Sequence, residues 1–359
     1  MQQPPSPPGR RPVPLILGAL LALGLGFFVV VLRFHPQRMF VPTDEFLVLF
    51  IFLLAVVGVY VLAAGFLVRR VRRALRSDRR QPGPAAVRTE RVVFVLACLG
   101  FACMGWGWLA EPYWPEVTHT RVATRKLPTG SRPVRIAHIS DLHCEAAPRL
   151  EERLPDLIAA EAPDLIAFTG DSLNEEAGLP TLKACLSRFA KIAPTFVVKG
   201  NWDVWHWDHL DRFGGTGVRE LDGDAVRVET KGGSTVWIAG VPIGGEAKAG
   251  AALAKIPPEA FGVFLCHYPN PEVVPPEMEH RADLFLAGHT HGGQVALPWY
   301  GAIITLARHG KKYERGLYDL GGRWMYVTRG IGMEGGLAPR VRFCARPEIA
   351  MIEVGPGKN

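Results

Sequence analysis

Residues 134–143 of this 359-residue chain are VRIAHISDLH, a β-branched apolar run that ends in Asp141 and His143. The apolar part, Val134–Ser140, is typical of a buried strand. The segments after it alternate between helical and strand patterns: a helix over 149–161, a strand over 164–170, a helix over 179–192 and a strand over 195–200. This order predicts an α/β fold. Further strands are expected at 225–229, 235–241, 263–267, 284–287, 325–328 and 349–354.

Five of the predicted strands end in residue types that bind metals, in the order Asp141, His143, Asp171, Asn201, His267, His289 and His291. In open α/β sheets, ligands gather outside the carboxyl ends of the strands. Any one of these fragments alone has an ordinary explanation, such as a turn or a buried histidine. Their recurrence on five strand ends argues instead for one shared site.

The residue types also indicate which metals this site would hold. Imidazole, carboxylate and carboxamide groups without a thiolate suit Mn, Fe, Zn or similar divalent ions. Seven ligands are too many for one ion with an open position, but they suit two ions that share a carboxylate. Such a pair can activate a water molecule and hold the oxygens of a phosphoryl group.

In order, these residues form the motifs D-x-H, G-D-x-x-N, G-N, a later His and G-H-x-H, which resemble those of the calcineurin-like metallophosphoesterases. The resemblance covers roughly 134–354. Further motifs are similar to the bacterial membrane-associated branch of that family: GHTHGGQ (Gly288–Gln294), Leu297-Pro298, YERGLY (Tyr313–Tyr318), YVTRGIG (Tyr326–Gly332) and RPEI (Arg346–Ile349).

The resemblance implies a four-layer α/β/β/α sandwich and a metal-dependent phosphoesterase. It implies a first metal held by Asp141, His143 and His291, a second held by Asn201, His267 and His289, and Asp171 as the bridge. Among these, the residues expected to act directly in catalysis are Asp171, Asn201, His267 and His289. Asn174, Trp202, Asp203 and His206 are possible supporting or substrate-contacting residues.

Trp202 is a departure from the family pattern, which usually has a histidine after this asparagine. That histidine is thought to help protonate the leaving group, and an indole cannot ionise. Three explanations stay open: His206 or His209 substitutes, although both are more simply surface histidines; the substrate has a good leaving group; or activity is lost. The complete set of ligands argues against the last.

Three apolar stretches precede this domain, and hydrophobic residues make up 48% of the chain. Each stretch is close to the roughly 20 residues that a helix needs to cross a bilayer core. We expect three transmembrane helices, at Val13–Leu32, Phe46–Val68 and Val92–Ala110. Buried core helices, or a signal peptide for the first stretch, are the alternatives. The predicted regions are a disordered N-terminus (1–12), a membrane domain (13–111), a linker (112–133) and the metallophosphoesterase domain (134–359).

The charges are unevenly distributed. Residues 1–111 hold 13 Lys or Arg against 5 Asp or Glu, whereas 112–359 hold 28 against 29. Nine arginines between the second and third apolar stretches predict a cytoplasmic loop. A multi-pass protein of the cytoplasmic membrane with an extracytoplasmic catalytic domain follows. No nucleic-acid partner is expected, because the catalytic part is nearly neutral. The six cysteines lack CxxC spacing, so a disulfide is left open.

The leading hypothesis is therefore a membrane-anchored hydrolase of phosphodiester, phosphomonoester or pyrophosphate bonds, with a substrate that could be lipid-linked. One alternative is a lipid pyrophosphate hydrolase of the UDP-diacylglucosamine type. An alternative of another class is a non-catalytic metal-binding membrane receptor or scaffold. Sequence alone leaves the physiological substrate, the metals and the oligomeric state open.

Overall fold

The computed structural model describes residues 42–76, 82–334 and 340–357. The chain divides into two compact units, 1–101 and 102–359. The predicted disordered N-terminus and the first predicted transmembrane helix, Val13–Leu32, lie outside the described residues. The other two predicted membrane helices correspond to α2 (Thr43–Leu75) and α3 (Pro84–Leu109).

Within the described residues, two helices, α2 and α3, are long and apolar enough to cross a membrane, judged by length and composition. In their most apolar windows only 11% and 17% of the residues are buried. Within the first unit they pack through Ala63, Val93 and Ala97, and small residues permit the close approach that membrane helices use. Helix α2 runs past its predicted end because Arg72 and Arg73 are good helix formers and suit the negative end of the helix dipole.

The second unit is built on two six-stranded sheets. The first sheet has the order β1-β14-β2-β3-β4-β5. Strands β2 to β5 are parallel, β14 is antiparallel to β2, and β1 is parallel to β14. The bounds are β1 (Glu116–Thr124), β14 (Glu348–Pro356), β2 (Val134–Ile139), β3 (Leu165–Phe168), β4 (Thr195–Val197) and β5 (Arg219–Glu220).

The second sheet has the order β12-β13-β9-β8-β7-β6. Its four central strands are parallel, and each edge strand is antiparallel to its neighbour. The bounds are β12 (Gly316–Asp319), β13 (Trp324–Val327), β9 (Leu284–Ala287), β8 (Phe261–Leu265), β7 (Thr235–Gly240) and β6 (Asp224–Glu229). A separate antiparallel pair joins β10 (Ala296–Leu297) to β11 (Gly301–Ala302).

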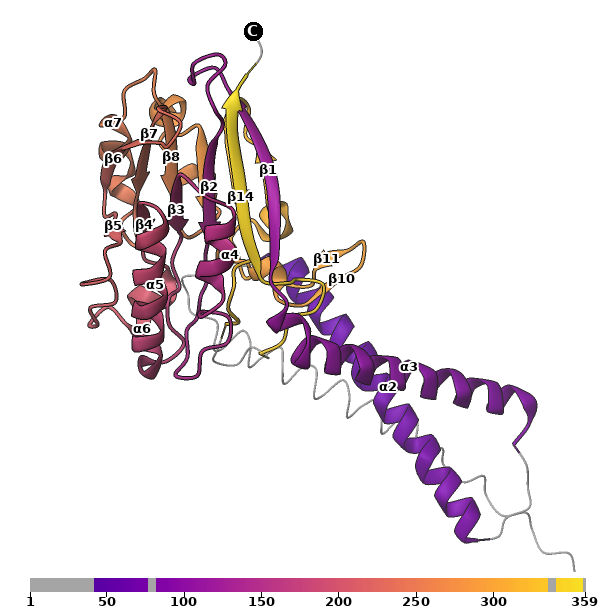
Figure 1. The fold of residues 1–359 in the computed structure, drawn as a ribbon. Helices are drawn as coiled ribbons and strands as arrows, with labels where there is room; N and C mark the ends of the chain where they lie inside the picture. Colours follow the sequence, from indigo (N-terminus) through magenta and orange to yellow (C-terminus); the bar gives the residue numbers. More distant parts are fainter. Residues whose placement is uncertain (1–41, 77–81, 335–339, 358–359) are drawn as a thin grey trace, which may run out of the picture. The chain divides into compact units, whose positions relative to one another are not determined.

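Four short helices complete the unit: α4 (Leu154–Ala160), α5 (Leu179–Ile192), α6 (Asn201–His206) and α7 (Ala249–Ala254). Short 3₁₀ helices lie at Glu111–Tyr113, Glu176–Gly178, Glu246–Lys248, Pro271–Val273, Pro276–Arg281, His291–Gly293 and Gly310–Tyr313. Figure 1 shows α4 and α5 beside the first sheet and α7 beside the second.

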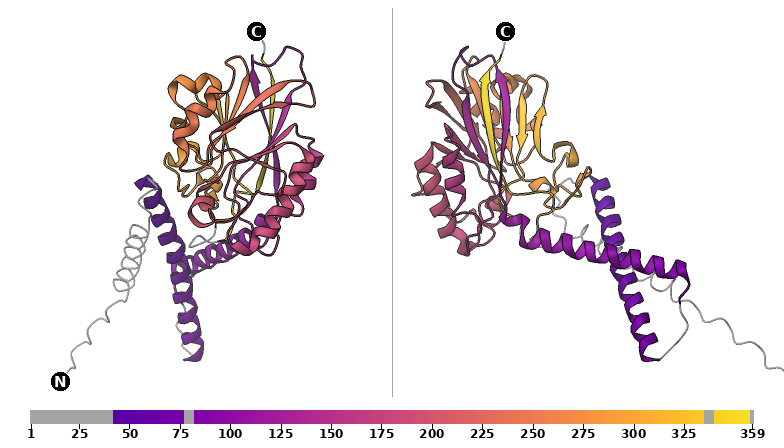
Figure 2. Two further views of the ribbon diagram at one scale, coloured as in Figure 1. Left: turned by 90° about the vertical axis from the view of Figure 1, so that its left-hand side faces the viewer. Right: turned by 45° about the vertical axis from the view of Figure 1, so that its right-hand side comes forward.

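Side-chain alternation along each strand divides the core into layers. In β2, Ile136 packs between the two sheets, and the next residue, Ala137, faces the helices. The central layer unites strands of both sheets, including Ile136 with Ile238 and Val263. In the left view of Figure 2, the strands lie between α4 and α5 on one side and orange helical segments on the other. The predicted α/β class is confirmed.

Several strands were not predicted, and β1 is the longest of them. It lies inside the segment expected to be a linker, and Val122 is its one buried residue. Its sequence, EVTHTRVAT, is largely polar because it forms an edge of the sheet. Its partner, β14, lies more than two hundred residues later, with Glu116 opposite Glu348. No local periodicity could indicate that pairing. The paired strands β10 and β11 and the strand β5 have two residues each, too few to show an alternation of buried and exposed residues.

Candidate metal centre

The seven predicted ligands lie at the carboxyl ends of strands from both sheets. Asp141 and His143 follow β2, and Asp171 follows β3 in the first sheet. From the second sheet, His267 follows β8, and the pair His289 and His291 follows β9. Asn201 is the first residue of α6, which begins after β4. The parallel order of these strands brings all five loops to the same edge of the sandwich.

Five of the seven residues have a left-handed backbone: Asp141, His143, Asp171, His289 and His291, with φ between 46° and 72°. Such conformations are unfavourable for residues with a side chain and persist where surrounding contacts fix them. Backbone hydrogen bonds do so here, because Asp141 N–H donates to Gly170 O at 2.8 Å and His143 N–H donates to Asp171 O at 3.0 Å. Strain of this kind concentrates at functional sites.

The side chains form two clusters of possible ligands, Asp141 with His143 and His291, and Asp171 with His267 and His289. Within each cluster the ligand atoms lie within 4.8 Å of one another. Asp171 joins the clusters, since its Oδ2 atom lies 3.2 Å from His267 Nε2 and 3.7 Å from His143 Nε2. All of these side chains are buried or nearly so.

Hydrogen bonds on the far side of two rings set which nitrogen faces the site. His267 Nδ1 lies 2.6 Å from Thr169 O, so it donates there and turns Nε2 toward the site. His289 Nε2 lies 3.1 Å from Leu306 O, which leaves Nδ1 for the site. Metal-bound histidines are oriented in this way. Both ring nitrogens of His143 and the Oδ1 atom of Asn201 are buried without a hydrogen-bond partner among the described residues, as expected of side chains that bind a cation.

Burial dominates the electrostatics of the site. It raises the pKa of Asp141 to about 6, although His267 opposes the shift. Burial also acts to raise the pKa of Asp171, but His267 and then His143 outweigh it and bring this pKa to about 2. The pKa of His267 is lowered by burial, yet the two carboxylates raise it to about 9. Burial lowers the pKa of His143 to about 4 and that of His289 to about 3, so these rings are neutral and able to bind a metal.

Asp203 lies under the loop that carries Asp171. Its Oδ2 atom accepts hydrogen bonds from the backbone N–H groups of Asp171 and Gly200, each at 2.9 Å. Its Oδ1 atom accepts from the N–H and the hydroxyl of Ser172, and Arg212 Nε lies 3.5 Å away. Gly200 is required here, since a Cβ atom at this position would overlap the Asp171 carboxylate.

Trp202 is held beside the site by its backbone and its ring. Its N–H donates to Asp171 Oδ1 at 2.8 Å, which turns the other carboxylate oxygen toward the histidines. The indole lies 5.4 Å from the His143 ring and 4.8 Å from the His206 ring. His206 is therefore at the rim of the site and exposed. His209, in contrast, is brought next to Trp207, at 6.4 Å.

Sequence reasoning did not identify two further polar residues at the site. The Trp202 indole hydrogen-bonds to Glu334, and burial, with the charge of Asp171, raises the pKa of Glu334 to about 7. Arg342 is fully buried and its Nη2 atom lies 3.4 Å from His291 Nδ1. Neither residue stands at a strand end, so the signal that revealed the ligands is missing for both.

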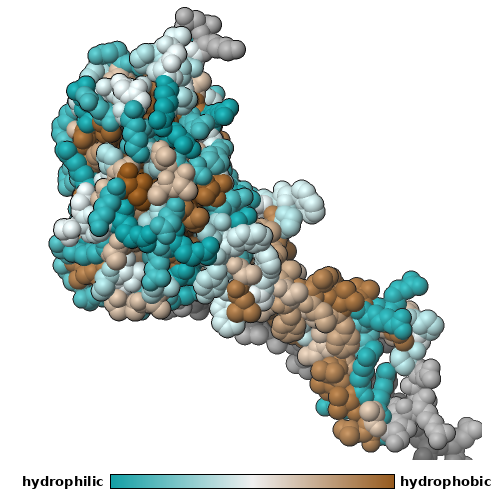
Figure 3. Space-filling view, viewed as in Figure 1, coloured by the Kyte–Doolittle hydropathy of each residue, from teal (hydrophilic) through white to brown (hydrophobic). Residues whose placement is uncertain are grey.

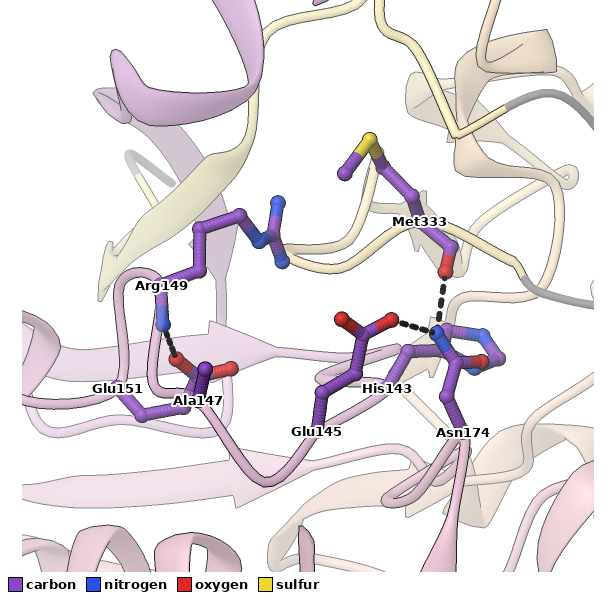
Figure 4. A pocket seen from close by; sticks show the side chains of 7 residues that line it. All are labelled: His143, Glu145, Ala147, Arg149, Glu151, Asn174 and Met333. Atoms are coloured by element: carbon purple, nitrogen blue, oxygen red, sulfur yellow. Dashed lines mark hydrogen bonds between the residues drawn. The ribbon is translucent and has the colours of Figure 1, made fainter.

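A small pocket opens beside His143 (Figure 4), and its polar lining includes Glu145, Arg149 and Asn174. The amide of Asn174 donates to Glu145 Oε1 at 3.1 Å and to the Met333 carbonyl at 2.9 Å. The guanidinium of Arg149 donates to the Pro112 carbonyl at 3.3 Å. Asn174 therefore ties two loops together at the edge of the site.

Comparison with known proteins agrees with this geometry. The family described as calcineurin-like phosphoesterase matches residues 134–293. The chain is 31% identical to the phosphodiesterase YaeI of Escherichia coli, over 70% of this chain and 93% of that protein. It is 29% identical to the metallophosphoesterase YkuE of Bacillus subtilis, over 69% of this chain and 88% of that protein. It is 33% identical to the UDP-2,3-diacylglucosamine pyrophosphatase LpxG of Chlamydia trachomatis over 26% of this chain and 29% of that protein.

Proposed function

The chain belongs to the calcineurin-like metallophosphoesterases, hydrolases of phosphoric ester bonds, and from this premise we propose that it is a membrane-anchored enzyme with two divalent metal ions. Its substrates are phosphodiesters, phosphomonoesters or pyrophosphates with a good leaving group. The observation that carries the proposal is the pair of buried clusters that meet at Asp171.

We assign Asp141, His143 and His291 to the first ion and Asn201, His267 and His289 to the second, with Asp171 shared between them. The unpartnered buried atoms of His143 and Asn201 support this assignment. The absence of a thiolate from either cluster supports Mn, Fe or Zn. When bound, two such ions would lower the pKa of a water molecule and neutralise phosphoryl oxygens.

The protein's own contribution is to hold these groups in place. Trp202 N–H and the Asp203 carboxylate fix Asp171 from two sides, through its side chain and its backbone. Thr169 and Leu306 carbonyls fix the tautomers of His267 and His289. Such prior orientation reduces the reorganisation that the reaction requires.

Because position 202 carries an indole, the usual donor of a proton to the leaving group is missing. General-acid catalysis typically contributes 10²–10⁴-fold, so substrates whose leaving group needs no proton, such as aryl or nucleotide phosphates, are favoured. Of the two histidines that could replace this donor, His206 lies nearer the site, because its exposed ring is 4.8 Å from the indole.

Two apolar helices support the membrane anchor, and the arginines between them support a cytoplasmic loop with the catalytic unit on the outer face. Reporter fusions after Ala110 test this orientation. An alkaline phosphatase reporter that is active there agrees with an outer face. A reporter active only in the cytoplasm would reverse the orientation and favour a lipid pyrophosphate hydrolase, for which the local similarity to LpxG is the supporting observation.

The catalytic proposal is tested on the full-length protein in detergent, freed of metal and then reloaded with Mn²⁺. We expect hydrolysis of bis-p-nitrophenyl phosphate by the wild type and background rates for Asp171→Ala. Asp208→Ala is the matched control, since Asp208 is an exposed carboxylate that forms an ion pair with Lys199, at 3.3 Å, and lies outside the two ligand clusters. A metal-replete wild type no faster than Asp171→Ala, on this ester and on a wider panel, would support the non-catalytic receptor or scaffold instead.

A further inference from the structure

Exposed large hydrophobic side chains are unevenly distributed over the second unit. Among its described residues they are confined to two segments, 104–114 and the pair Trp299–Tyr300. On the face of the domain seen in Figure 3, hydrophilic residues (teal) predominate and the hydrophobic ones (brown) are scattered. Single exposed apolar residues are ordinary, but a restriction to two segments requires a cause.

Trp299 lies at the tip of the β10–β11 hairpin. Its relative exposure is 104%, and its φ of 62° places it in the left-handed region. The next residue, Tyr300, is anchored, because Lys311 lies 4.2 Å from its ring centre and donates to its carbonyl at 2.8 Å. Lys311 also donates to Ala302 O at 2.8 Å. Lys311 thus holds the hairpin in place, while the indole of Trp299 at its tip is fully exposed.

The two exposed segments are joined by one stretch of chain. Ala296 N–H donates to Phe343 O at 2.8 Å, and Phe343 N–H donates to Gln294 O at 3.0 Å. The neighbouring Arg342 N–H donates to the Gly107 carbonyl of α3 at 2.8 Å. Residues 102–109, the final turns of α3, belong to the same unit as the hairpin. Two consecutive residues, Arg342 and Phe343, therefore connect the hairpin to the end of α3 through backbone hydrogen bonds.

The aromatic residues around that helix end have the composition of a membrane interface. Trp106 and Trp114 lie 5.9 Å apart, and Arg346 covers the Trp114 ring at 4.2 Å. Tryptophan and tyrosine concentrate at the level of the lipid head groups, where an apolar ring with one polar atom is favoured. Trp299 and Tyr300 are the same residue types, presented beside the same helix end.

We propose that the tip of the β10–β11 hairpin inserts into the interface of the bilayer that holds α3. This inference rests on the proposed membrane anchor and adds a second contact to it. The hairpin begins two residues after Gln294, the last residue of the loop that carries His289 and His291. Docking of the tip would hold that side of the metal centre at the membrane surface, where a lipid-borne phosphoester can enter without leaving the bilayer.

The experiment places a fluorescent probe at the tip of the full-length protein. The exposed cysteines Cys98, Cys103 and Cys344 are changed to Ser, and Trp299→Cys is labelled with nitrobenzoxadiazole. The protein is reconstituted in vesicles of phosphatidylethanolamine and phosphatidylglycerol. We expect quenching by spin-labelled lipids and protection from aqueous iodide.

Two labelled controls make the outcomes distinct. Glu259→Cys lies in an exposed loop just before β8, at the end of the strands opposite the site, and should be quenched by iodide. Leu62→Cys lies on α2, is 51% exposed and should be quenched by lipid. If Leu62→Cys is quenched by lipid but Trp299→Cys by iodide, the anchor stands and the docking proposal is wrong. Protection of Trp299→Cys from both quenchers would indicate a protein partner or second copy and also overturn it. Quenching of Leu62→Cys by iodide would refute the anchor itself.

A kinetic measurement separates docking from simple burial of the probe. Trp299→Ala removes the uncovered ring and leaves Lys311 and Tyr300 in place. We expect kcat/KM for a phosphoester lipid in these vesicles to fall by about tenfold, the effect of losing about 1.4 kcal/mol of contact. The rate with soluble bis-p-nitrophenyl phosphate should not change. Equal effects on both substrates, or an effect on neither, would contradict the proposal.

Discussion

Asp203→Asn is the substitution whose effect the structure defines most closely. Each carboxylate oxygen of Asp203 accepts two hydrogen bonds, from Asp171 N–H and Gly200 N–H on one side and from Ser172 on the other. An asparagine offers oxygen to one pair only, and its amide nitrogen faces the other two donors. A hydrogen bond to a charged group contributes about 1.5–3 kcal/mol. The loss of two is therefore worth roughly 3–6 kcal/mol before the loop relaxes.

The loop that moves carries Asp171, the proposed shared ligand, so the effect should reach metal binding. Removal of such a supporting contact typically weakens metal binding by about 10- to 100-fold. We expect the Mn²⁺ concentration that gives half-maximal activity to rise by that factor, with most of the turnover restored in excess Mn²⁺. The unfolding transition should move to lower denaturant. Both quantities are measured on the full-length protein in detergent.

Asp208→Asn is the control for this measurement. It makes the same chemical change on an exposed carboxylate a few residues away, where an ion pair contributes at most about 1 kcal/mol. Its Mn²⁺ requirement should equal that of the wild type. The reasoning would be refuted by an Asp203→Asn protein that needs no more Mn²⁺ than this control and unfolds at the same denaturant concentration.

Three further substitutions test other parts of the structure. Burial lowers the pKa of His138 from 6.5 to about 3. As the pH drops from about 6.5 toward 3, this histidine is protonated in the unfolded chain but not in the folded one, so the free energy of unfolding falls. Between pH 7 and pH 5 the free energy of unfolding should fall by about 2 kcal/mol. Urea unfolding of His138→Gln at the two pH values should not show this contribution. Glu348 accepts from the Thr118 hydroxyl at 2.7 Å and from Arg329 N–H at 2.9 Å. Glu348→Gln keeps only one of the two oxygens, so it should lower the free energy of unfolding by about 1.5–3 kcal/mol for each bond lost. This appears as a lower Tm, and an unchanged Tm contradicts a structural role. Trp202→His should raise turnover of alkyl phosphodiesters by up to about 10²-fold relative to nitrophenyl esters, and an equal change for both argues against a missing acid.

The strands that carry the ligands were predictable because their signal is local. Val134–Ser140 and 284–287 are short apolar runs followed by polar residues, and strand β9 has the predicted bounds, Leu284–Ala287. Helix α5 likewise has its predicted bounds, Leu179–Ile192, since its buried residues recur at helical spacing. Periodicity of this kind depends only on neighbours in sequence. The long apolar runs behind α2 and α3 were visible for the same reason.

The amino-acid sequence by itself determined the α/β class, the family and the residue types available to a metal centre. Tertiary structure alone decided how these groups meet. Asp171 lies between His143 of one sheet and His267 of the other, and no sequence spacing encodes a distance between two sheets. The same holds for β1, which pairs with a strand more than two hundred residues away. It holds also for Glu334, which is part of the site because the fold brings it within hydrogen-bond distance of the Trp202 indole. Hydrophobic periodicity reflects interactions between residues that are close in sequence. A site made of loops from several strands depends instead on packing between segments that are distant in sequence.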